Sequence, residues 1–575
     1  MAFSHFHGYA VNNPGLIIFS LFRIYSSLWE YAGIEEVFSL IAACLAAAVA
    51  KIVIILFTWS VMPRSWYVLD TIYLMILIGA TRVSYRLIRL RRQNRTFPWS
   101  KRKKVMIIGG GEAGRSLITE IQNSKYLDQK VVCIIDDDPY KIGRYIKGVK
   151  VVGNRNSIKK SVKKYNVQQI ILTIPSANAA KIRPIVEICQ DTNCELMILP
   201  GVYQLVNGEV RASKLRPVNI DDLLGRDEVY VNLDEVMDYV SGRVIMVTGG
   251  GGSIGSEICR QIAKHSPKQL IIFDIYENNA YDIQQELLRE QPKLDLVVLI
   301  GSVRDENRIN SIFEQYRPEI IYHAAAHKHV PLMEGSPNEA IKNNVLGTYN
   351  MVRMADKWNV KRFVQISTDK AVNPTNIMGA SKRICEMIIQ TYNKESNTEY
   401  VAVRFGNVLG SNGSVIPLFK KQIAEGGPVT VTHPEIIRYF MTIPEAVSLV
   451  LQAGAYAKGG EIFVLDMGEP VKILDLARNM IRLSGYKVDQ DIKIEFTGLR
   501  PGEKLYEELL MDEEGMTDTP NKLIHIGHPI DVDEVKLAHA LRVLESAAQN
   551  ETDDMRLIVE SIVPTYHPKL NKSTQ

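Results

Sequence analysis

Apolar and polar positions divide the chain into an N-terminal part with long apolar runs and a longer part with short ones. The segment 37–59 is apolar apart from Lys51 and two hydroxyl residues, and a second apolar run follows it. About 20 apolar residues are enough to cross a bilayer, although a buried soluble helix has the same pattern and Lys51 is unfavourable in lipid. The pattern predicts a membrane region over 1–95 with at least two transmembrane helices, about 37–59 and 66–88.

A basic segment follows the second apolar run. Ten Lys or Arg residues and no Asp or Glu lie between Arg82 and Lys104. Positive charge beside a membrane span favours the cytoplasmic side. The sequence therefore predicts a multi-pass protein of the inner (plasma) membrane, with the lipid bilayer as a partner and the rest of the chain in the cytoplasm.

The next part has the pattern of a first nucleotide-binding unit. An apolar strand over 105–108 runs into a glycine motif and a helix, and a second strand over 131–135 ends in three aspartates. This order is typical of a Rossmann-like domain, predicted over 101–210 and followed by a polar connector over 211–240. A structural or regulatory domain without an essential ligand is the alternative. The residues of a possible second nucleotide site are Gly109, Gly111, Gly114 and Asp136.

A second glycine motif follows the strand pattern 244–247 and precedes a helix. Glycines are needed there because the backbone turns tightly and approaches the pyrophosphate of a dinucleotide at the helix N-terminus. The following strand, 270–273, ends in a carboxylate that would bond both ribose hydroxyls and repel a 2′-phosphate, so NAD is favoured over NADP. The predicted cofactor residues of this segment are Thr248, Gly249, Gly252, Ser253, Ile254, Gly255 and Asp274.

The most chemically informative stretch follows the strand pattern 363–366. Thr368, Asp369 and Lys370 place a hydroxyl, a carboxyl and an amine side by side just beyond that strand, where open α/β sheets carry out chemistry. Lys382 comes four residues after Met378, on the same face of the predicted helix. Short-chain dehydrogenases have tyrosine in place of Met378, and a thioether cannot do that proton transfer. The proton chemistry is therefore assigned to the three residues after the strand.

Three features together resemble one enzyme family. They are the run 367–371 (Ser-Thr-Asp-Lys-Ala), the methionine in place of tyrosine, and the segment 499–504 (Leu-Arg-Pro-Gly-Glu-Lys). The sequence resembles the membrane-anchored UDP-N-acetylglucosamine 4,6-dehydratases of bacterial polysaccharide biosynthesis, in the extended short-chain dehydrogenase/reductase superfamily. The resemblance implies an α/β fold in which transmembrane helices precede two Rossmann-type domains with doubly wound parallel sheets.

The same resemblance implies the domain organisation and further site residues. The NAD-dependent dehydratase domain would cover 241–530, with a small C-terminal substrate subdomain, and a helical tail would cover 531–575. Asp305 would meet the adenine, Ala324 and Ala325 would line the cofactor, and Lys382 would hold the nicotinamide ribose. The residues expected around the UDP-sugar are Lys328, Glu334, Met378, Asn407, Arg438, Arg500 and Glu503.

The resemblance also implies a role for each reacting side chain. Thr368 would act at the carbon-4 hydroxyl, Asp369 would protonate the leaving carbon-6 hydroxyl, and Lys370 would remove the carbon-5 proton. An exchange of roles between Asp369 and Lys370 is an open alternative. As a base, Lys370 would have to be neutral, which the nearby Lys382 and a water-poor pocket would favour.

Composition adds few constraints. The net charge of +4 gives no general attraction to nucleic acid, and the six scattered cysteines predict reduced thiols rather than a zinc site. His323, His327 and His329 are close in sequence, but no acidic ligand pattern accompanies them, so a metal is not expected. A homo-oligomer is expected. A UDP-sugar 4-epimerase and a non-catalytic, nucleotide-sensing membrane protein are the alternative functions.

Overall fold

The structure is a computed structural model. The residues that it describes are 18–22, 34–57, 64–93, 102–124, 127–177, 179–192, 194–199, 215–218, 237–508, 515–527 and 532–568. They form two compact units. The N-terminal one lies within Met1–Lys103 and also includes Lys125–Lys130, and the larger one contains most of the two large β-sheets. Most of the predicted connector 211–240 lies outside the described residues.

The N-terminal unit contains two long helices, α2 (Ile34–Phe57) and α3 (Arg64–Gln93). Lys51 of α2 and Asp70 of α3 form an ion pair, with 2.6 Å between Nζ and Oδ2. Charged side chains within a span are costly in hydrocarbon. Of the described helices, none combines the length and the apolar character needed to cross a membrane, so the prediction of N-terminal transmembrane helices at 37–59 and 66–88 is wrong.

A seven-stranded sheet follows, with the strand order β3-β4-β2-β1-β5-β6-β7. Neighbours β4 and β2, β1 and β5, and β5 and β6 are parallel, and the edge strands β3 and β7 are antiparallel to their neighbours. The strands are β1 (Lys103–Ile108), β2 (Gln129–Ile135), β3 (Tyr145–Ile146), β4 (Val149–Gly153), β5 (Gln169–Leu172), β6 (Glu195–Ile198) and β7 (Arg216–Pro217). The accompanying helices are α4 (Glu112–Asn123), α5 (Ile158–Tyr165) and α6 (Ala179–Gln190).

The second sheet has nine strands in the order β10-β9-β8-β11-β12-β13-β18-β22-β21. It is parallel from β10 to β18, and β22 and β21 continue it in antiparallel pairing. Its strands are β8 (Val244–Thr248), β9 (Gln269–Asp274), β10 (Leu296–Ile300), β11 (Ile320–His323), β12 (Arg362–Ile366), β13 (Glu399–Arg404), β18 (Ile462–Leu465), β21 (Met516–Asp518) and β22 (Ile524–Gly527). The predicted α/β fold with parallel sheets is confirmed.

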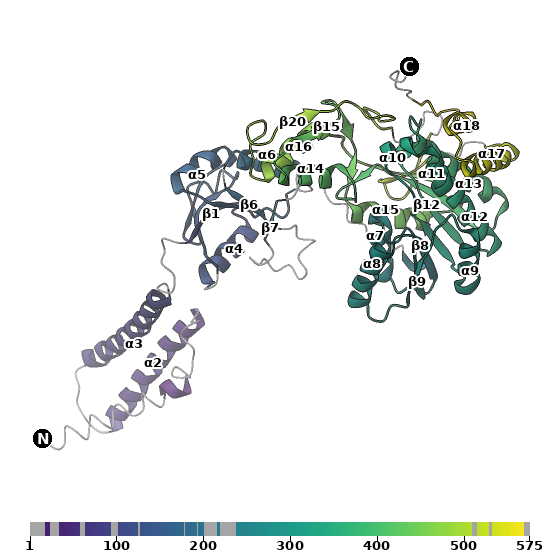
Figure 1. Cartoon of the computed structure of the whole chain (residues 1–575). Helices are drawn as coiled ribbons and strands as arrows, with labels where there is room; N and C mark the ends of the chain where they lie inside the picture. The colour runs from purple at the N-terminus through teal and green to yellow at the C-terminus, as the bar shows by residue number, and fades with distance from the viewer. Residues whose placement is uncertain are drawn as a thin grey trace. The chain divides into compact units, whose positions relative to one another are not determined.

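Helices cover both faces of the second sheet (Figure 1). Alternate strand residues face opposite sides, as in β8, where Ile245 and Val247 pack on one face and Met246 on the other. One face is covered by α7 (Ser253–Ala263), α8 (Glu277–Glu290) and α15 (Ile443–Tyr456). The other is covered by α9 (Glu306–Tyr316), α12 (Gly347–Lys357), α13 (Ile377–Glu395), α17 (Glu534–Gln549) and α18 (Met555–Ile562).

The chain order of the second sheet reverses between β8 and β11, since β9 and β10 lie on one side of β8 and β11 to β13 on the other. Ligands of open α/β sheets bind beyond the carboxyl ends of the strands at such a point. Short elements lie in the segment that follows β13: β14 (Asn407–Val408), α14 (Val415–Ala424), β15 (Val429–Val431), β16 (Ile437–Arg438), β17 (Phe440–Met441), β19 (Val471–Lys472), α16 (Ile473–Leu483) and β20 (Ile494–Phe496).

Candidate active site

The glycine loop between β8 and α7 is packed too closely for side chains. Gly249 has a φ of +66°, and a Cβ on it would lie 2.8 Å from the Cα of Ala325. A Cβ on Gly255 would overlap the carbonyl oxygen of Gly249. Gly252 is the N-cap of α7, so the loop ends on the exposed N–H groups of that helix. Ala324 and Ala325 therefore border this loop, and their predicted contact with a cofactor stays a prediction.

Asp274, at the end of β9, is hydrogen-bonded to the same loop. Its Oδ2 accepts a hydrogen bond from the backbone N–H of Gly251 at 2.8 Å, and its Oδ1 accepts one from the N–H of Tyr276 at 2.8 Å. A cleft of about 400 Å³ lies beside the loop and is bordered by Gly251, Ser253 and Asn279. A glycine turn, a helix N-terminus and a carboxylate at the next strand end are the groups that hold a dinucleotide, so these residues fit one.

Thr248 connects the glycine loop to the interior through a histidine. His323 contacts Thr248 Oγ1 through Nδ1 at 2.7 Å and Thr348 Oγ1 through Nε2 at 3.1 Å. Burial, with a smaller effect of the Lys382 charge, lowers the pKa of His323 to about 3. This neutral histidine therefore joins β8, β11 and α12. Sequence reasoning missed this role, because the pattern does not show that Thr348 faces the histidine.

The other histidines of the cluster point to different partners. His327 Nε2 lies 3.1 Å from a guanidinium nitrogen of Arg304, and His329 packs against Gly413. Within the part of the chain that the structure describes, no three His, Cys, Asp or Glu side chains are grouped as a metal site would require.

Two further predicted cofactor residues have local partners. Asp305 is the N-cap of α9, and its Oδ1 accepts a hydrogen bond from the N–H of Arg308 at 3.0 Å. Ser253 Oγ accepts one from the N–H of Asn412 at 3.2 Å. Their predicted contacts with a cofactor stay predictions.

The predicted catalytic residues form one cluster at the end of β12. Asp369 is fully buried, and its Oδ1 accepts hydrogen bonds from Thr368 Oγ1 at 2.8 Å and from Lys370 Nζ at 2.9 Å. Its second oxygen, Oδ2, is buried and has no hydrogen-bond partner among the described residues. A Cβ on Gly406 would lie 3.0 Å from that oxygen, so the glycine keeps space beside it. A hydroxyl, a carboxyl and an amine thus share a water-poor site, and one carboxylate oxygen remains available.

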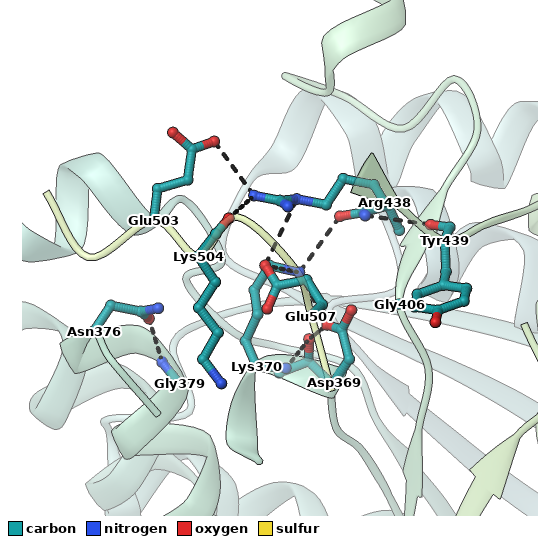
Figure 2. Close-up of polar contacts among 12 residues, drawn as sticks. Asp369, Lys370, Asn376, Gly379, Gly406, Arg438, Tyr439, Glu503, Lys504 and Glu507 are labelled. Atoms are coloured by element: carbon teal, nitrogen blue, oxygen red, sulfur yellow. Dashed lines mark hydrogen bonds and ion pairs between the residues drawn. The ribbon is translucent and has the colours of Figure 1, made fainter. Parts of the chain in front are cut away.

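Glu507 completes this cluster, and sequence reasoning missed it. Figure 2 shows its carboxylate between Lys370 and Arg438, with Oε1 3.8 Å from Lys370 Nζ and 3.6 Å from Arg438 Nε. Burial raises the pKa of Glu507 in spite of these cations. Two glutamates four residues apart, Glu503 and Glu507, were the available signal, but the pattern does not place either of them beside the amine.

The charge of Lys370 depends on the neighbouring carboxyl groups. Burial by itself lowers the pKa of the Lys370 amine, but the charges of Asp369 and Glu507 outweigh burial and raise the pKa above its ordinary value. Lys382 does not act on it in the expected way: its Nζ donates to the carbonyl oxygen of Ile366 at 2.9 Å, and burial lowers its own pKa. These charges favour an ammonium on Lys370, and the neutral amine that a base requires in the active form stays a prediction.

Arg438 holds the segment that carries Glu507. Its Nη2 donates to the Lys504 carbonyl at 2.7 Å and lies 3.5 Å from Glu503 Oε1 (Figure 2). Its Nη1 donates to the Leu505 carbonyl at 3.2 Å. Glu503 is shared with Arg500, whose Nη2 lies 3.1 Å away. The structure brings these three predicted substrate residues together, and their contact with a nucleotide stays a prediction.

The remaining predicted substrate residues lie around the start of α13 and beside the cluster. Asn407 Oδ1 accepts from Lys370 Nζ at 3.4 Å, and Met378 is buried in the first turns of α13. Glu334 Oε1 accepts from the N–H of Ile377 at 2.7 Å, so it supports that helix start. Burial lowers the pKa of Lys328. Glu334 is turned toward the helix, and its predicted role beside the sugar is untested.

The first sheet repeats the geometry of the cofactor loop. Gly109 has a φ of +107°, and a Cβ on Gly114 would overlap its carbonyl oxygen, as for Gly255 and Gly249. Asp136 Oδ2 accepts from the N–H of Gly110 at 2.6 Å, but it also accepts from Lys141 Nζ at 3.0 Å. Gly111 has open space around it. The predicted second nucleotide at this loop stays a prediction.

Two family models match the sequence. The model described as a polysaccharide biosynthesis protein matches residues 245–529, and the model described as a CoA-binding domain matches residues 21–200. The capsular polysaccharide biosynthesis protein CapD of Staphylococcus aureus is 45% identical over 539 residues, which cover 89% of this chain and 89% of that protein.

Two further similarities were found. The probable polysaccharide biosynthesis protein EpsC of Bacillus subtilis is 44% identical, covering 89% of this chain and 85% of that protein. Among solved structures, Pen from Bacillus thuringiensis is 36% identical, with a TM-score of 0.47, and the match covers 51% of this chain and 89% of that chain.

Proposed function

Because this chain belongs to the polysaccharide biosynthesis protein family, we propose that it is an NAD-dependent 4,6-dehydratase of UDP-N-acetylglucosamine. The product is a UDP-4-keto-6-deoxy-N-acetylhexosamine for the synthesis of a polysaccharide or another glycan. One observation carries this proposal: Thr368, Asp369 and Lys370 share a buried site at the end of β12, and a methionine stands where a dehydrogenase has its tyrosine.

NAD is the cofactor of this reaction. The glycine loop 249–255 and the α7 N-terminus would hold its pyrophosphate, Asp274 would hold the adenosine ribose, and Lys382 would hold the nicotinamide ribose. When bound, NAD accepts the hydride from sugar carbon 4 and returns it to carbon 6. Because Asp274 already accepts two backbone N–H groups, it is fixed before any ribose arrives.

The chain's own residues move the protons. Thr368 holds the carbon-4 hydroxyl, which releases its proton to water as it becomes a ketone. The ketone makes the hydrogen on carbon 5 acidic. Lys370 takes that hydrogen as a proton, and Asp369 gives a proton to the carbon-6 hydroxyl, which leaves as water. The 2.9 Å between the two groups lets one proton pass between them, whichever of them acts as acid.

The cysteines support a reducing compartment. The six cysteines are free thiols. Five of them are buried, and four of these five lie in the larger unit. Unpaired thiols are typical of the cytoplasm. We place the reaction there.

The test uses the full chain with UDP-N-acetylglucosamine and NAD⁺ in deuterated water, followed by proton NMR. A new 6-deoxy methyl signal with deuterium at carbon 5 is the expected result. Lys370→Met should abolish it, while Lys264→Met, on an exposed lysine, should not. A product that keeps its carbon-6 oxygen and differs only in configuration at carbon 4 would instead establish a 4-epimerase. An unchanged substrate with folded, NAD-bound protein would overturn the proposal.

A further inference from the structure

The candidate active site contains a buried carboxyl, that of Glu507, which has no role in the proposed reaction. Glu507 lies in the segment that follows Gly502, far in sequence from the catalytic residues, yet its Oε1 is 3.8 Å from Lys370 Nζ. The side chain is only 4% exposed. A buried carboxyl at this distance from a catalytic amine affects that amine strongly, because little water screens the interaction.

The position of Glu507 is fixed by its neighbours. Arg438 Nε lies 3.6 Å from the same Oε1, and the Arg438 guanidinium donates to the carbonyls of Lys504 and Leu505. Lys504 Nζ in turn donates to the carbonyl of Val372 at 3.1 Å, just after the catalytic turn. These contacts hold the segment 502–508 against the catalytic turn and fix the Glu507 carboxylate beside Lys370.

The charges that act on Glu507 come from three parts of the chain. Lys370 and Asp369 face it from the catalytic turn, Arg438 from β16, and Lys504 from its own segment. Of these, Lys370 acts on it more strongly than Asp369 does. A negative charge on Glu507 therefore stabilises an ammonium on Lys370, whose Nζ lies 3.8 Å from Oε1.

We propose that Glu507 is a positioning residue whose protonation decides where the proton shared by Lys370 and Asp369 resides. When Glu507 is ionised, the proton stays on Lys370, and the pair is an ammonium and a carboxylate. When Glu507 is protonated, the proton can move to Asp369 and leave Lys370 as a free amine. The consequence for catalysis rests on the proposed dehydration, whereas the coupling of the two side chains does not.

The proton balance explains why the second state is the one that reacts. In it the Lys370 amine takes the proton from carbon 5 while the Asp369 carboxylic acid gives its proton to the carbon-6 oxygen. The carbon-6 to oxygen bond breaks, a carbon-5 to carbon-6 double bond forms, and water leaves. Lys370 is then an ammonium and Asp369 a carboxylate again. As the hydride returns to carbon 6, Lys370 gives a proton to carbon 5 and is a free amine again. Asp369 regains from water the equivalent of the proton that the carbon-4 hydroxyl released, which restores the reactive pair.

The first experiment measures the lysine itself. Lys370 in the full chain is reductively methylated over a range of pH, and the modified peptide is quantified by mass spectrometry, since only the free amine reacts. Glu507→Gln should make Lys370 about tenfold more reactive at a given pH, a shift of about one pH unit. Glu508→Gln is the matched control, because Glu508 is half-exposed and contacts Lys504 and Asn373 instead. Equal reactivity in wild type and Glu507→Gln would overturn the proposal.

The second experiment measures kcat of the dehydration against pH. Wild type should lose rate as Glu507 ionises on the alkaline side, Glu507→Gln should not show this loss, and Glu508→Gln should behave as wild type. A merely structural role would lower all rates without removing that loss.

If wild type forms no product but Lys370 reactivity still shifts, the proposed function fails and the coupling stands. If Glu507→Gln does not fold, Glu507→Asp should shift the lysine in the same direction by a smaller amount, and no shift would overturn the proposal.

Discussion

Glu386 of α13 and Arg404 of β13 form a fully buried, two-pronged ion pair. Arg404 Nε lies 2.7 Å from Glu386 Oε1, and Arg404 Nη2 lies 2.7 Å from Oε2. Ser367 Oγ also donates to Oε1, at 2.7 Å, and Ser367 directly precedes the catalytic turn. The pair therefore anchors α13 and β13 at the strand end that carries the candidate active site.

Glu386→Gln should lower the free energy of unfolding by about 3–5 kcal/mol, because it removes the buried negative charge that Arg404 and Arg383 share. Glu399→Gln is the comparison, since Glu399 pairs with Arg362 at a partly exposed position, and its loss should be about 1 kcal/mol or less. Guanidinium denaturation of both variants measures the difference. Similar losses for the two variants would show that the buried pair contributes no more to the free energy of unfolding than the partly exposed pair.

Acid should weaken the protein through the same glutamate. Burial would raise the pKa of Glu386, but the charge and hydrogen bonds of Arg404 outweigh burial and lower it to about 2. A carboxyl whose pKa is depressed in the folded state stabilises the protein above its ordinary pKa of about 4.5 and loses this contribution as pH falls toward 2. Denaturation at pH 5, 4 and 3 should show a steeper loss for wild type than for Glu386→Gln. Parallel curves would contradict the assignment.

His323 should produce a loss of stability at higher pH than Glu386. Its pKa is lowered to about 3, mainly by burial, so the unfolded chain binds a proton near pH 6.5 that the folded chain does not. Its contribution is complete above pH 6.5 and falls by about 1.4 kcal/mol per pH unit below that. His323→Gln should remove this slope between pH 6.5 and 5, whereas His539→Gln, on an exposed histidine, should keep it. A slope that persists in His323→Gln would refute the prediction.

The sequence predicts what depends on local pattern. Apolar runs placed β8, β9 and β12 correctly, because buried parallel strands appear in the sequence as continuous apolar segments. Asp274 and the three residues after β12 could be selected because function follows strand ends in such sheets. The same reasoning failed for the N-terminal helices: two apolar runs suggested spans, but an ion pair between Lys51 and Asp70 joins them.

What the sequence misses depends on contacts between distant residues. Glu507 is 137 positions from Lys370, and nothing near Glu507 in the sequence shows that Arg438 and Lys504 fasten it there. The effect of Glu507 on the Lys370 charge was therefore not part of the prediction, which considered Lys382 and a water-poor pocket. Thr348 was missed as a partner of His323 for the same reason, since helix α12 meets β11 only in the folded chain.

Cofactor binding should depend on the closest approach in the glycine loop. Gly255→Ala would force a methyl group against the Gly249 carbonyl, which would displace the loop from the α7 N-terminus. NAD affinity should fall by at least about tenfold, equivalent to about 1.4 kcal/mol. Gly335→Ala is the control, because no atom lies within 4 Å of a Cβ at that position. Titration calorimetry measures both, and equal affinity in Gly255→Ala and wild type would remove this loop from the cofactor site.

Arg438 should be irreplaceable by lysine because it acts through the geometry of its guanidinium. Its nitrogens reach the carbonyls of Lys504 and Leu505 and the carboxylates of Glu503 and Glu507 at the same time, and a single ammonium cannot reproduce that fork. Arg438→Lys should therefore release the segment 502–508 and move Glu507 away from Lys370. Hydrogen exchange should show faster exchange in this segment, and the pH dependence of Lys370 methylation should shift in the same direction as in Glu507→Gln.

Arg500→Lys is the matched control, since Arg500 is exposed and pairs only with Glu503 among the described residues, and it should leave both measurements unchanged. If Arg438→Lys leaves exchange and methylation as in wild type, the segment is held by other contacts, and Arg438 is then better explained by its predicted contact with the substrate diphosphate.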